Sequence, residues 1–475
     1  MTFEIRKVCC IGAGYVGGPT MAVFANKCSN IQFKVVDINS ERINAWNSKD
    51  LSKLPIFEPG LEQLISKCRE KNLFFTTDIE SSIREADMIF LSVNTPTKTK
   101  GIGAGKASDL RWIEASARQI AEFSSSHTIV VEKSTLPVRT AETIKKILES
   151  SQNNQTKSLP NKSFSVLSNP EFLAEGNAIQ DLENPDRVLI GGEDNKAIAA
   201  LEEIYLNWIS PEKIIRTNLW SSELSKLTAN AFLAQRISSI NSISAICEET
   251  GADINQVAKA VGLDSRIGNK FLMPSPGFGG SCFQKDILNL IYLCEFYKLD
   301  AVAKYWQGVI DINKWQKTRI SQLIINKLFG NASGKKIAIL GFAFKSNTND
   351  IRNSPAIDIC EDLLEEGSHL AIYDPKVTHS QINIALEQKI KRLRSSDEMN
   401  ILNVYSSIND VFNDCDAVVV LTEWEEFSFI DWVKCSKVMR KPSWVFDTRS
   451  CVNKQEIINA GFNFWRIGSE TNHFF

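Results

Sequence analysis

The sequence is poor in the side chains that build metal centres, and its charges nearly cancel. It has four histidines and no Cys-x-x-Cys pair, so we expect no metal site. A formal net charge of −2 gives no broad basic surface, which argues against nucleic acid as a partner. No apolar run approaches the roughly 18 residues that span a bilayer, and residues 1–7 carry no signal-peptide core. We therefore expect neither a membrane partner nor secretion.

The cysteine content points in the same direction. Eleven cysteines, an odd number at irregular spacing, occur in a chain of 475 residues. In a large chain this pattern is typical of reduced thiols in the cytosol. An apolar content of 43% and a charged content of 23% are those of a globular protein, and the length predicts two or three domains.

A glycine-rich turn after a short apolar strand predicts a dinucleotide site near the amino terminus. Gly12, Gly14 and Gly17 have the G-x-G-x-x-G spacing, and a second strand ends in Asp37, twenty residues after Gly17. The pattern assigns Gly12 to the turn, Gly14 to the pyrophosphate, Gly17 to helix packing and Asp37 to the ribose hydroxyls. The alternative is a glycine turn without a ligand. Because an acid repels a 2′-phosphate, we expect NAD rather than NADP.

Two further predicted strands, residues 88–93 and 127–131, also end in polar turns. Ligands of parallel sheets bind at the carboxyl ends of strands, so these turns are expected to line the cofactor crevice. Arg42 lies near Asp37 in the sequence. It could stack on the adenine or be a solvated helix arginine.

Two pairs of polar residues have helical spacing. Glu171 and Glu175 follow an Asn-Pro turn, and on a helix they would share one face. One carboxylate could then act as a base or hold a water, with its pKa raised by the other; a solvent-facing pair is the alternative. Lys226 and Asn230 lie near the start of a long predicted helix, residues 222–250, which Gly251 would close. A snorkelling surface lysine is the common alternative for Lys226.

A third pair lies in the run from Gly277 to Asp286, which contains three glycines, a serine and Cys282. We expect Ser281 to cap a helix and Cys282 to lie in its first turn, where the helix dipole favours the thiolate. Asp286 would lie on the same face. A buried structural cysteine is the alternative.

An NAD site and a thiolate together indicate a particular chemistry. An alcohol is oxidised to an aldehyde by the cofactor and a base alone. Oxidation of the aldehyde needs a carbon that can donate a hydride, and a thiol provides it by forming a thiohemiacetal. The resulting thioester is then hydrolysed, so NAD with Cys282 predicts an oxidation that ends at a carboxylate.

The last third of the chain repeats the α/β pattern. A strand at residues 335–340 is followed by a helix and a strand ending in Asp374, but the turn lacks the three glycines. We expect a sugar nucleotide here, with Lys345 and Arg449 near strand ends to meet phosphate; solvated basic residues are the alternative. The predicted fold is α/β, with two Rossmann-like, doubly wound parallel sheets joined by a long helix and a helical middle domain. The predicted domains are residues 1–218, 219–330 and 331–475.

Motifs along most of the chain resemble the UDP-glucose/GDP-mannose dehydrogenase family, and especially its eukaryotic members that act on UDP-glucose. The motifs are Gly12-Ala-Gly-Tyr-Val-Gly, Ser92-Val-Asn-Thr-Pro, Glu132-Lys-Ser-Thr, Ser168-Asn-Pro-Glu-Phe-Leu-Ala-Glu-Gly, Ser225-Lys-Leu-Thr-Ala-Asn-Ala-Phe, Arg266-Ile-Gly-Asn, Gly277-Phe-Gly-Gly-Ser-Cys-Phe-Gln-Lys-Asp, Gly341-Phe-Ala-Phe-Lys and Tyr373-Asp-Pro-Lys. The resemblance covers residues 3–468. It implies a two-step, four-electron oxidation of UDP-glucose to UDP-glucuronate with two NAD, and assembly as a dimer or hexamer.

The resemblance also implies residue roles. Cys282 would be the nucleophile, Lys226 and Asn230 would stabilise oxyanions, and Asp286, Thr135 and Glu171 would handle water or protons. The expected cofactor contacts are Gly12, Ala13, Gly14, Tyr15, Val16, Gly17, Asp37, Arg42, Ser92, Val93, Asn94, Thr95, Pro96, Ser134, Thr135, Leu136, Glu175, Cys282, Lys285 and Arg352. The expected substrate contacts are Glu171, Phe172, Leu173, Ala174, Glu175, Lys226, Asn230, Arg266 of a neighbouring subunit, Met273, Pro274, Ser275, Pro276, Gly277, Phe278, Gly279, Phe344, Lys345 and Arg449.

Other functions stay open at this point. A dehydrogenase of GDP-mannose or UDP-N-acetylmannosamine is the near alternative, and a non-catalytic NAD-binding scaffold is the more distant one. Residues 151–162 and 380–405 are longer than the family pattern leads us to expect. Thr140 departs from the alanine expected in a segment linked to feedback inhibition, so feedback by UDP-xylose is in doubt.

Overall fold

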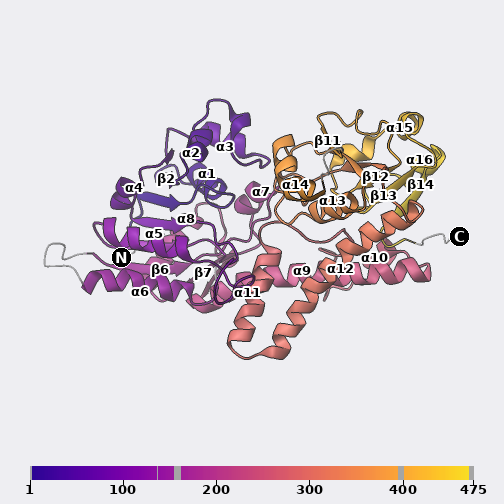
Figure 1. Cartoon of the computed structure of the whole chain (residues 1–475). Helices are drawn as coiled ribbons and strands as arrows, with labels where there is room; N and C mark the ends of the chain where they lie inside the picture. The colour runs from indigo at the N-terminus through magenta and orange to yellow at the C-terminus, as the bar shows by residue number, and fades with distance from the viewer. Residues whose placement is uncertain (1–2, 136, 154–161, 394–400, 470–475) are drawn as a thin grey trace. The chain divides into compact units, whose positions relative to one another are not determined.

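The structure, a computed structural model, describes residues 3–135, 137–153, 162–393 and 401–469. The chain forms two compact units, Met1–Ala229 with Leu288–Leu293, and Asn230–Ile287 with Cys294–Phe475. Each unit contains one β-sheet with helices around it (Figure 1). The predicted division into three domains, at residues 218 and 330, stays a prediction.

Within the described part of the first unit, the sheet has eight strands in the order β3-β2-β1-β4-β5-β6-β7-β8. Its first six strands follow the order 3-2-1-4-5-6 of a doubly wound dinucleotide-binding fold, as predicted. The pairing of β7 with β6 is antiparallel, which departs from the predicted parallel sheet. The strands are β1 (Lys7–Ile11), β2 (Gln32–Val36), β3 (Leu73–Thr76), β4 (Met88–Leu91), β5 (Thr128–Glu132), β6 (Phe164–Ser168), β7 (Val188–Gly192) and β8 (Ile214–Thr217).

Helices cover both faces of this sheet because alternate strand residues point to opposite sides. In β1, Val8 and Cys10 belong to the core under α1, α3, α7 and α8, whereas Cys9 and Ile11 belong to the core under α4, α5 and α6. The helices are α1 (Gly17–Lys27), α2 (Ser40–Trp46), η1 (Leu51–Lys53), α3 (Leu61–Cys68), α4 (Ile79–Glu85), α5 (Arg111–Phe123), α6 (Thr140–Asn153), α7 (Ala178–Glu183), α8 (Asn195–Tyr205) and η2 (Pro211–Lys213). The strands of this sheet that run parallel have their carboxyl ends at one edge of the sheet, and the predicted cofactor residues lie at that edge.

Long helices dominate the middle of the chain: α9 (Leu219–Thr250), α10 (Ile254–Gly262), α11 (Phe283–Phe296) and α12 (Asp300–Lys327). As predicted, Gly251 follows α9 in a left-handed conformation, with φ of 76°. Small residues of α9 allow close packing, and the Ser238 hydroxyl donates to the Val309 carbonyl on α12 (2.9 Å). The buried residues of α9 include Ala231, Ala234, Ser238, Asn241 and Ser244.

The second unit contains a six-stranded parallel sheet within the described residues, in the order β11-β10-β9-β12-β13-β14. This is again the order 3-2-1-4-5-6, so the predicted second doubly wound sheet is confirmed. Its elements are β9 (Lys336–Leu340), α13 (Pro355–Glu365), β10 (His369–Tyr373), α14 (His379–Leu393), β11 (Leu402–Tyr405), β12 (Ala417–Val420), η3 (Glu425–Phe429), α15 (Trp432–Val438), β13 (Trp444–Asp447), α16 (Lys454–Asn459) and β14 (Asn463–Arg466).

The two segments that we expected to be long fall partly on these elements. Residues 151–153 end α6, and residues 380–393 and 402–405 belong to α14 and β11. Residues 154–161 and 394–400 lie outside the described residues. In the described ranges, no helix is long and apolar enough to cross a bilayer.

Candidate active site

The turn after β1 leaves space beside one glycine and none beside the other two. A Cβ added to Gly12, whose φ is +111°, would lie 2.4 Å from the Ser92 carbonyl oxygen. A Cβ on Gly17 would lie 2.0 Å from the Gly12 carbonyl oxygen, whereas one on Gly14 would meet no atom within 4 Å. A side chain at Gly12 or Gly17 would thus clash with the backbone, whereas the space beside Gly14 is open. This geometry fits the approach of a pyrophosphate to Gly14 at the start of α1.

Asp37 lies directly after β2 and is 9% exposed. Its Oδ2 accepts hydrogen bonds from Ala13 N–H (3.0 Å) and from Arg42 Nη1 (3.0 Å), and its Oδ1 accepts from Asn39 N–H (2.9 Å). Arg42 is therefore paired with Asp37, which neither of the two sequence-based interpretations of Arg42 included. The carboxylate is fixed at the end of the strand, where a ribose would be bound.

The polar turns after β4 and β5 are bonded to each other. The Ser134 hydroxyl donates to the Val93 carbonyl (2.8 Å), and the Thr95 hydroxyl donates to the Thr135 carbonyl (3.2 Å). The structure thus brings together the two predicted stretches, Ser92 to Pro96 and Ser134 to Thr135. Leu136, also predicted to contact the cofactor, lies outside the described residues.

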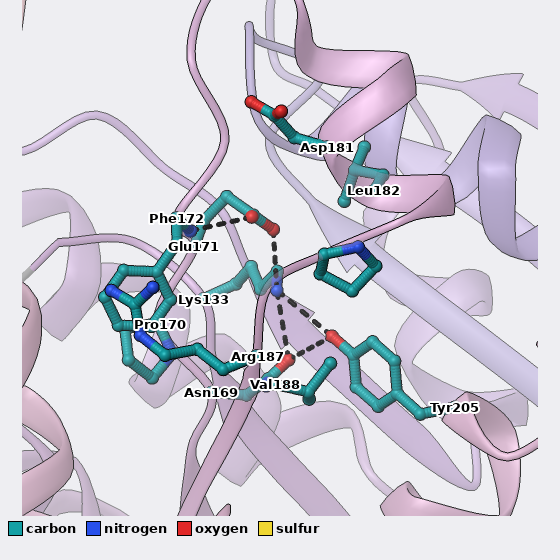
Figure 2. Close-up of a pocket in the computed structure, with 11 residues that line it drawn as sticks. Lys133, Asn169, Pro170, Glu171, Phe172, Asp181, Leu182, Arg187, Val188 and Tyr205 are labelled. Carbon is teal, nitrogen blue, oxygen red and sulfur yellow. Dashed lines mark hydrogen bonds and ion pairs between the residues drawn. The ribbon is translucent and has the colours of Figure 1, made fainter. Parts of the chain in front are cut away.

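Glu171 and Glu175 do not lie on a helix, so the predicted shared helical face is wrong. Residues 171–174 are irregular and 175–176 form a turn. The Glu171 side chain explains this, because its Oε1 accepts from Phe172 N–H (2.8 Å) and Leu173 N–H (3.0 Å). Such local bonds replace the helical ones. Its Oε2 forms an ion pair with Lys133 Nζ (2.7 Å), so the neighbour of Glu171 is a cation instead of Glu175 (Figure 2).

Lys133 is the residue that sequence reasoning missed here. It lies in a pocket lined by Asn169, Glu171, Arg187, Tyr205 and others, with a volume of about 20 Å³ (Figure 2). The signal in the sequence was only local, since Lys133 directly follows the apolar strand 128–131 and Glu132. Buried charges of this kind require a partner.

Lys226 is buried, at 6% exposure, so the surface-lysine alternative is wrong. Its Nζ lies 5.3 Å from the centre of the Phe172 ring, and the Arg187 guanidinium lies 3.9 Å from the same ring. Aromatic faces attract cations at such distances. Phe172 therefore places Lys226 close to the segment that carries Glu171, all within the first unit.

Cys282 lies one position earlier in its helix than predicted. The helix α11 begins at Phe283, and the Cys282 carbonyl accepts from Asp286 N–H (2.9 Å). The residue whose carbonyl accepts the first helical bond is the capping residue, so Cys282, not Ser281, occupies that position. The Ser281 hydroxyl lies 3.3 Å from the Cys282 sulfur. The thiol is still at the amino end of the helix.

Asp286 and Asn230 form a buried pair beside this helix start. Asn230 Nδ2 donates to Asp286 Oδ2 (2.6 Å), and the residues are 5% and 2% exposed. Lys285 Nζ lies 3.9 Å from Asp286 Oδ1. The second unit thus assembles three of the predicted reactive residues, Cys282, Asn230 and Asp286.

Exposure and thiol pKa together separate Cys282 from the other thiols. All eleven cysteines are free; Cys282 and Cys451 are partly exposed, and the other nine are buried. Burial raises the pKa of each of the other ten, for example to about 11 in Cys28 and to about 12 in Cys451. Because the thiolate is the nucleophile, those ten are poor candidates.

Glycines shape the loop that precedes Cys282. A Cβ on Gly279 would lie 2.5 Å from the Asn353 carbonyl oxygen, and Gly280 N–H donates to the Arg352 carbonyl (2.8 Å). The Arg352 guanidinium binds Asp350 through several bonds of 2.7–3.0 Å. Arg352 therefore supports this loop, and its predicted contact with NAD stays a prediction. Of the predicted substrate contacts in this loop, Met273 is exposed and Pro274, Ser275, Pro276, Gly277, Phe278 and Gly279 are buried.

Arg266 has a side chain that is 87% exposed and paired with Asp264. Its predicted role in a neighbouring subunit's site stays a prediction. The same holds for Ala174, Leu173, Tyr15 and Val16, whose positions after β6 and β1 suit the predicted contacts but do not test them.

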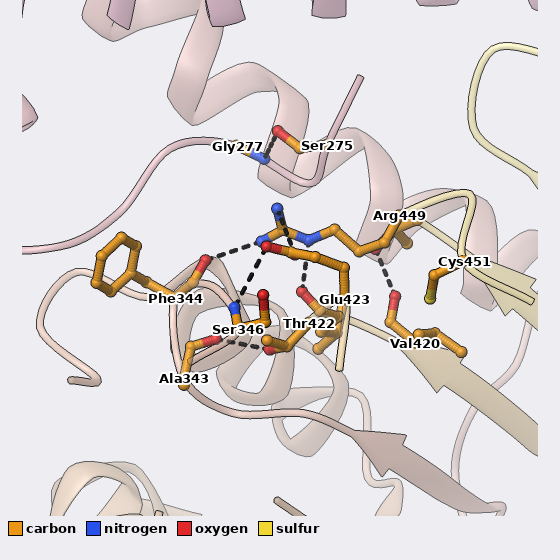
Figure 3. A network of polar contacts seen from close by, with 12 residues as sticks. Ser275, Gly277, Ala343, Phe344, Ser346, Val420, Thr422, Glu423, Arg449 and Cys451 are labelled. Atoms are coloured by element: carbon orange, nitrogen blue, oxygen red, sulfur yellow. Dashed lines mark hydrogen bonds and ion pairs between the residues drawn. The ribbon is translucent and has the colours of Figure 1, made fainter. Parts of the chain in front are cut away.

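Arg449 is the centre of a polar network after β13 (Figure 3). Its guanidinium donates to the carbonyls of Leu421 (2.8 Å) and Phe344 (2.9 Å) and pairs with Glu423 (3.1 Å). The side chain is 11% exposed, so the solvated-arginine alternative is wrong for this residue. Lys345 Nζ lies 5.7 Å from the Phe344 ring.

The acid beside the turn after β9, Asp374, makes more hydrogen bonds to its turn than Asp37 makes to the turn after β1. Asp374 Oδ2 accepts from Phe342 N–H (2.7 Å), Ala343 N–H (3.0 Å) and Trp424 Nε1 (3.2 Å). Asp37 makes one such backbone bond across its turn, to Ala13. The carboxylate of Asp374 is thus occupied within the fold, and the expectation that this turn holds no second dinucleotide stays a prediction. Across the residues described, no cluster of three His, Cys, Asp or Glu side chains could hold a metal ion.

Three family models match consecutive parts of the chain, all from the UDP-glucose/GDP-mannose dehydrogenase family. The NAD binding domain matches residues 6–209, the central domain residues 220–315 and the UDP binding domain residues 338–454. Together they match well over half of the sequence.

Curated relatives and solved structures agree with these models. A UDP-glucose 6-dehydrogenase of Bos taurus is 54% identical over 99% of this chain and 94% of its own length. One from Drosophila melanogaster is 55% identical over 98% and 96%. A UDP-glucose dehydrogenase structure from Pyrobaculum islandicum has a TM-score of 0.81 at 27% identity, covering 98% of both chains. A UDP-D-ManNAc dehydrogenase structure from Pyrococcus horikoshii has a TM-score of 0.78 at 25% identity, covering 98% of this chain and 99% of that one.

Proposed function

The chain belongs to the UDP-glucose/GDP-mannose dehydrogenase family, and from that membership we propose that it oxidises UDP-glucose to UDP-glucuronate with two NAD. The observation that carries the proposal is its identity of about 54% over nearly the full length with UDP-glucose 6-dehydrogenases of animals and plants. The structure supports it with a partly exposed thiol at a helix start beside a buried amide–carboxylate pair.

We propose that NAD binds at the carboxyl ends of β1, β2, β4 and β5. Gly14 would face the pyrophosphate, and Asp37 would bind the ribose. When bound, the nicotinamide accepts a hydride in each oxidation. The fixed carboxylate of Asp37 disfavours a 2′-phosphate, which supports NAD over NADP.

We propose that Cys282 is the nucleophile that adds to the C6 aldehyde. The addition joins sulfur to carbon and yields a thiohemiacetal, whose carbon then loses a hydride to give a thioester. Lys226 and Asn230 would stabilise the oxygen anions that form during addition and hydrolysis. Asp286, held by Asn230, would fix the amide so that its remaining N–H can face the substrate.

We propose that Glu171 accepts a proton from the water that hydrolyses the thioester, with Thr135 placing water nearby. The nucleotide would be bound by the second unit, where the UDP binding domain model covers Phe344 and Lys345 and ends shortly after Arg449. Arg266 would complete the site of a neighbouring subunit, which requires a dimer or a hexamer. The eleven free thiols support a cytosolic location.

The yield of NADH per UDP-glucose tests the proposal. Limiting UDP-glucose with excess NAD should give two NADH for each sugar, and the product should carry a carboxylate by mass spectrometry. A yield of one would mean that oxidation stops at the aldehyde. UDP-N-acetylmannosamine and GDP-mannose should turn over more slowly under the same conditions, and faster turnover of either would overturn the choice of substrate.

A further inference from the structure

Lys133 is a buried lysine whose three N–H donors all have acceptors. Its Nζ lies 2.7 Å from Glu171 Oε2, 3.1 Å from Asn169 Oδ1 and 3.2 Å from Tyr205 Oη, and its side chain is 3% exposed (Figure 2). An ammonium group has three donors and no acceptor. Two neutral acceptors therefore hold the nitrogen in place, and its third donor faces the Glu171 carboxylate.

The two neutral acceptors are themselves fixed. Tyr205 Oη donates to Asn169 Oδ1 (2.6 Å), and Asn169 Nδ2 donates to the Leu189 carbonyl (2.8 Å). These residues come from the end of α8, from the turn after β6, and from β7. Because Tyr205 and Leu189 belong to regular elements and Asn169 directly follows β6, the nitrogen has a defined position relative to the sheet.

The contacts of the carboxylate distinguish its two oxygens. Oε1 accepts from two backbone N–H groups, Phe172 and Leu173, which uses both of its lone pairs. Oε2 has the ion pair with Lys133 and retains a lone pair. A proton arriving at Glu171 is therefore directed to Oε2, the oxygen next to the ammonium.

The charges of the pair balance in a buried setting. Burial, the largest single cause, lowers the pKa of Lys133, but Glu171 and Tyr205 together outweigh this effect, and the net pKa is raised. Lys133 thus stays protonated while it contacts Glu171. Removing one partner of a buried pair leaves the other charge uncompensated.

We propose that Lys133 is a positioning residue, which orients Glu171 so that Oε2, the oxygen that the backbone bonds leave available, takes the proton of the hydrolytic water. This inference rests on the proposed function. In the step concerned, the water oxygen bonds to the thioester carbon, one water proton passes to Oε2, and the carbon–sulfur bond breaks. Cys282 leaves as a thiolate, and no electrons are exchanged with the cofactor.

Lys133→Met tests the proposal, with Lys162→Met as the matched control. Lys162 is also buried in the first unit and donates to the Glu122 carbonyl (3.1 Å), but it lies at the amino end of β6, opposite to Glu171. In Lys133→Met we expect a first turnover that still releases two NADH per subunit, followed by a steady-state rate reduced on the order of 100-fold. The UDP-glucuronyl thioester should accumulate on Cys282 and be visible as a mass increase of the acid-quenched protein.

A second variant separates positioning from general damage. Tyr205→Phe keeps the Lys133 charge and removes one of its acceptors. We expect it to slow the hydrolysis of the thioester by roughly tenfold, with a first turnover that still releases two NADH. If Lys133→Met fails to fold, this variant tests the proposal.

The outcomes are distinct. Wild-type steady-state rates in Lys133→Met, or a slow first turnover without thioester accumulation, would overturn the role of Lys133. The same loss in Lys162→Met would overturn it as well. A wild-type protein that forms no NADH from UDP-glucose would overturn the proposed function instead.

Discussion

The amide of Asn230 on α9 donates to the carboxylate of Asp286 on α11 across 2.6 Å, and both side chains are almost fully buried. This bond joins two helices whose sequences are more than fifty residues apart. Beside it, the carbonyl of Cys282 accepts the first hydrogen bond of α11. The thiol and Asp286 therefore lie at the start of the same helix.

Asn230→Ala should therefore lower the free energy of unfolding by about 1.5–3 kcal/mol, the range for a hydrogen bond to a charged group. Urea denaturation measures it. A double-mutant cycle with Asp286→Ala should give a coupling of at least about 0.5 kcal/mol. The exposed bond of Gln307 to Asp311 provides the control, since Gln307→Ala should change little. Additive effects of the two substitutions would contradict a direct coupling.

Cys282→Ser should reduce NADH formation from UDP-glucose by roughly three orders of magnitude, because a hydroxyl is a far weaker nucleophile than a thiolate. NAD binding, followed by titration, should persist. Cys294→Ser, in the same helix, replaces a buried thiol whose pKa is raised by burial and should leave the rate near wild type. Undiminished UDP-glucuronate formation by Cys282→Ser would remove the thiol from the mechanism.

Asp37→Asn should shift the cofactor preference toward NADP. The substitution removes the negative charge next to the expected ribose and frees Arg42, which now pairs with Asp37. The ratio of the dissociation constants for NADP and NAD should fall by about tenfold or more, as measured by calorimetry. Glu41→Gln neutralises an exposed acid nearby and should leave the ratio unchanged. An identical ratio in both variants would refute the role of Asp37.

Glu132→Gln should make stability less sensitive to rising pH. Burial and the neighbouring Glu223 raise the pKa of Glu132 well above its ordinary value, and Glu223 accepts from Arg139 N–H and Ala141 N–H at the start of α6. The folded state thus binds a proton that the unfolded state releases above its carboxyl pKa of about 4.5.

The sign follows from linkage. The contribution of the pair is fully present below that unfolded pKa and is lost as the pH rises through the raised value. The free energy of unfolding should therefore fall with pH more steeply in the wild type than in Glu132→Gln, whose amide can still donate to Glu223. Thermal or urea unfolding at several pH values measures the slopes, and equal slopes would contradict the proton-sharing pair.

Much of the fold could be predicted because local pattern and tertiary structure agree. The run after β1 needs glycine at positions 12 and 17 for steric reasons, and that need is visible in the sequence. The strand–helix–strand pattern that ends in Asp374 likewise predicted the second sheet. The antiparallel β7 had no local signal, since its direction depends on the path of the chain between β6 and β7.

The site was harder to predict in the places where side chains bond to the backbone. Glu171 and Glu175 have helical spacing, but Glu171 bonds to the two following N–H groups and prevents a helix. The helix α11 begins one residue later than predicted, because a helix boundary depends on which carbonyl accepts the first helical hydrogen bond. Lys133 was missed because its partners are distant in sequence, with Tyr205 72 positions away.

The inward-facing carboxylate of Asp374 has a consequence for the order of events in the proposed reaction. Since Asp374 bonds to the backbone of its own turn, the proposed dinucleotide site at Gly14 and Asp37 would have to serve both oxidations. A reaction that removes two electron pairs must then exchange spent for fresh coenzyme midway. The half-oxidised sugar has to stay bound during that exchange. The second unit, which is proposed to bind the nucleotide, would then have to retain it through both oxidations.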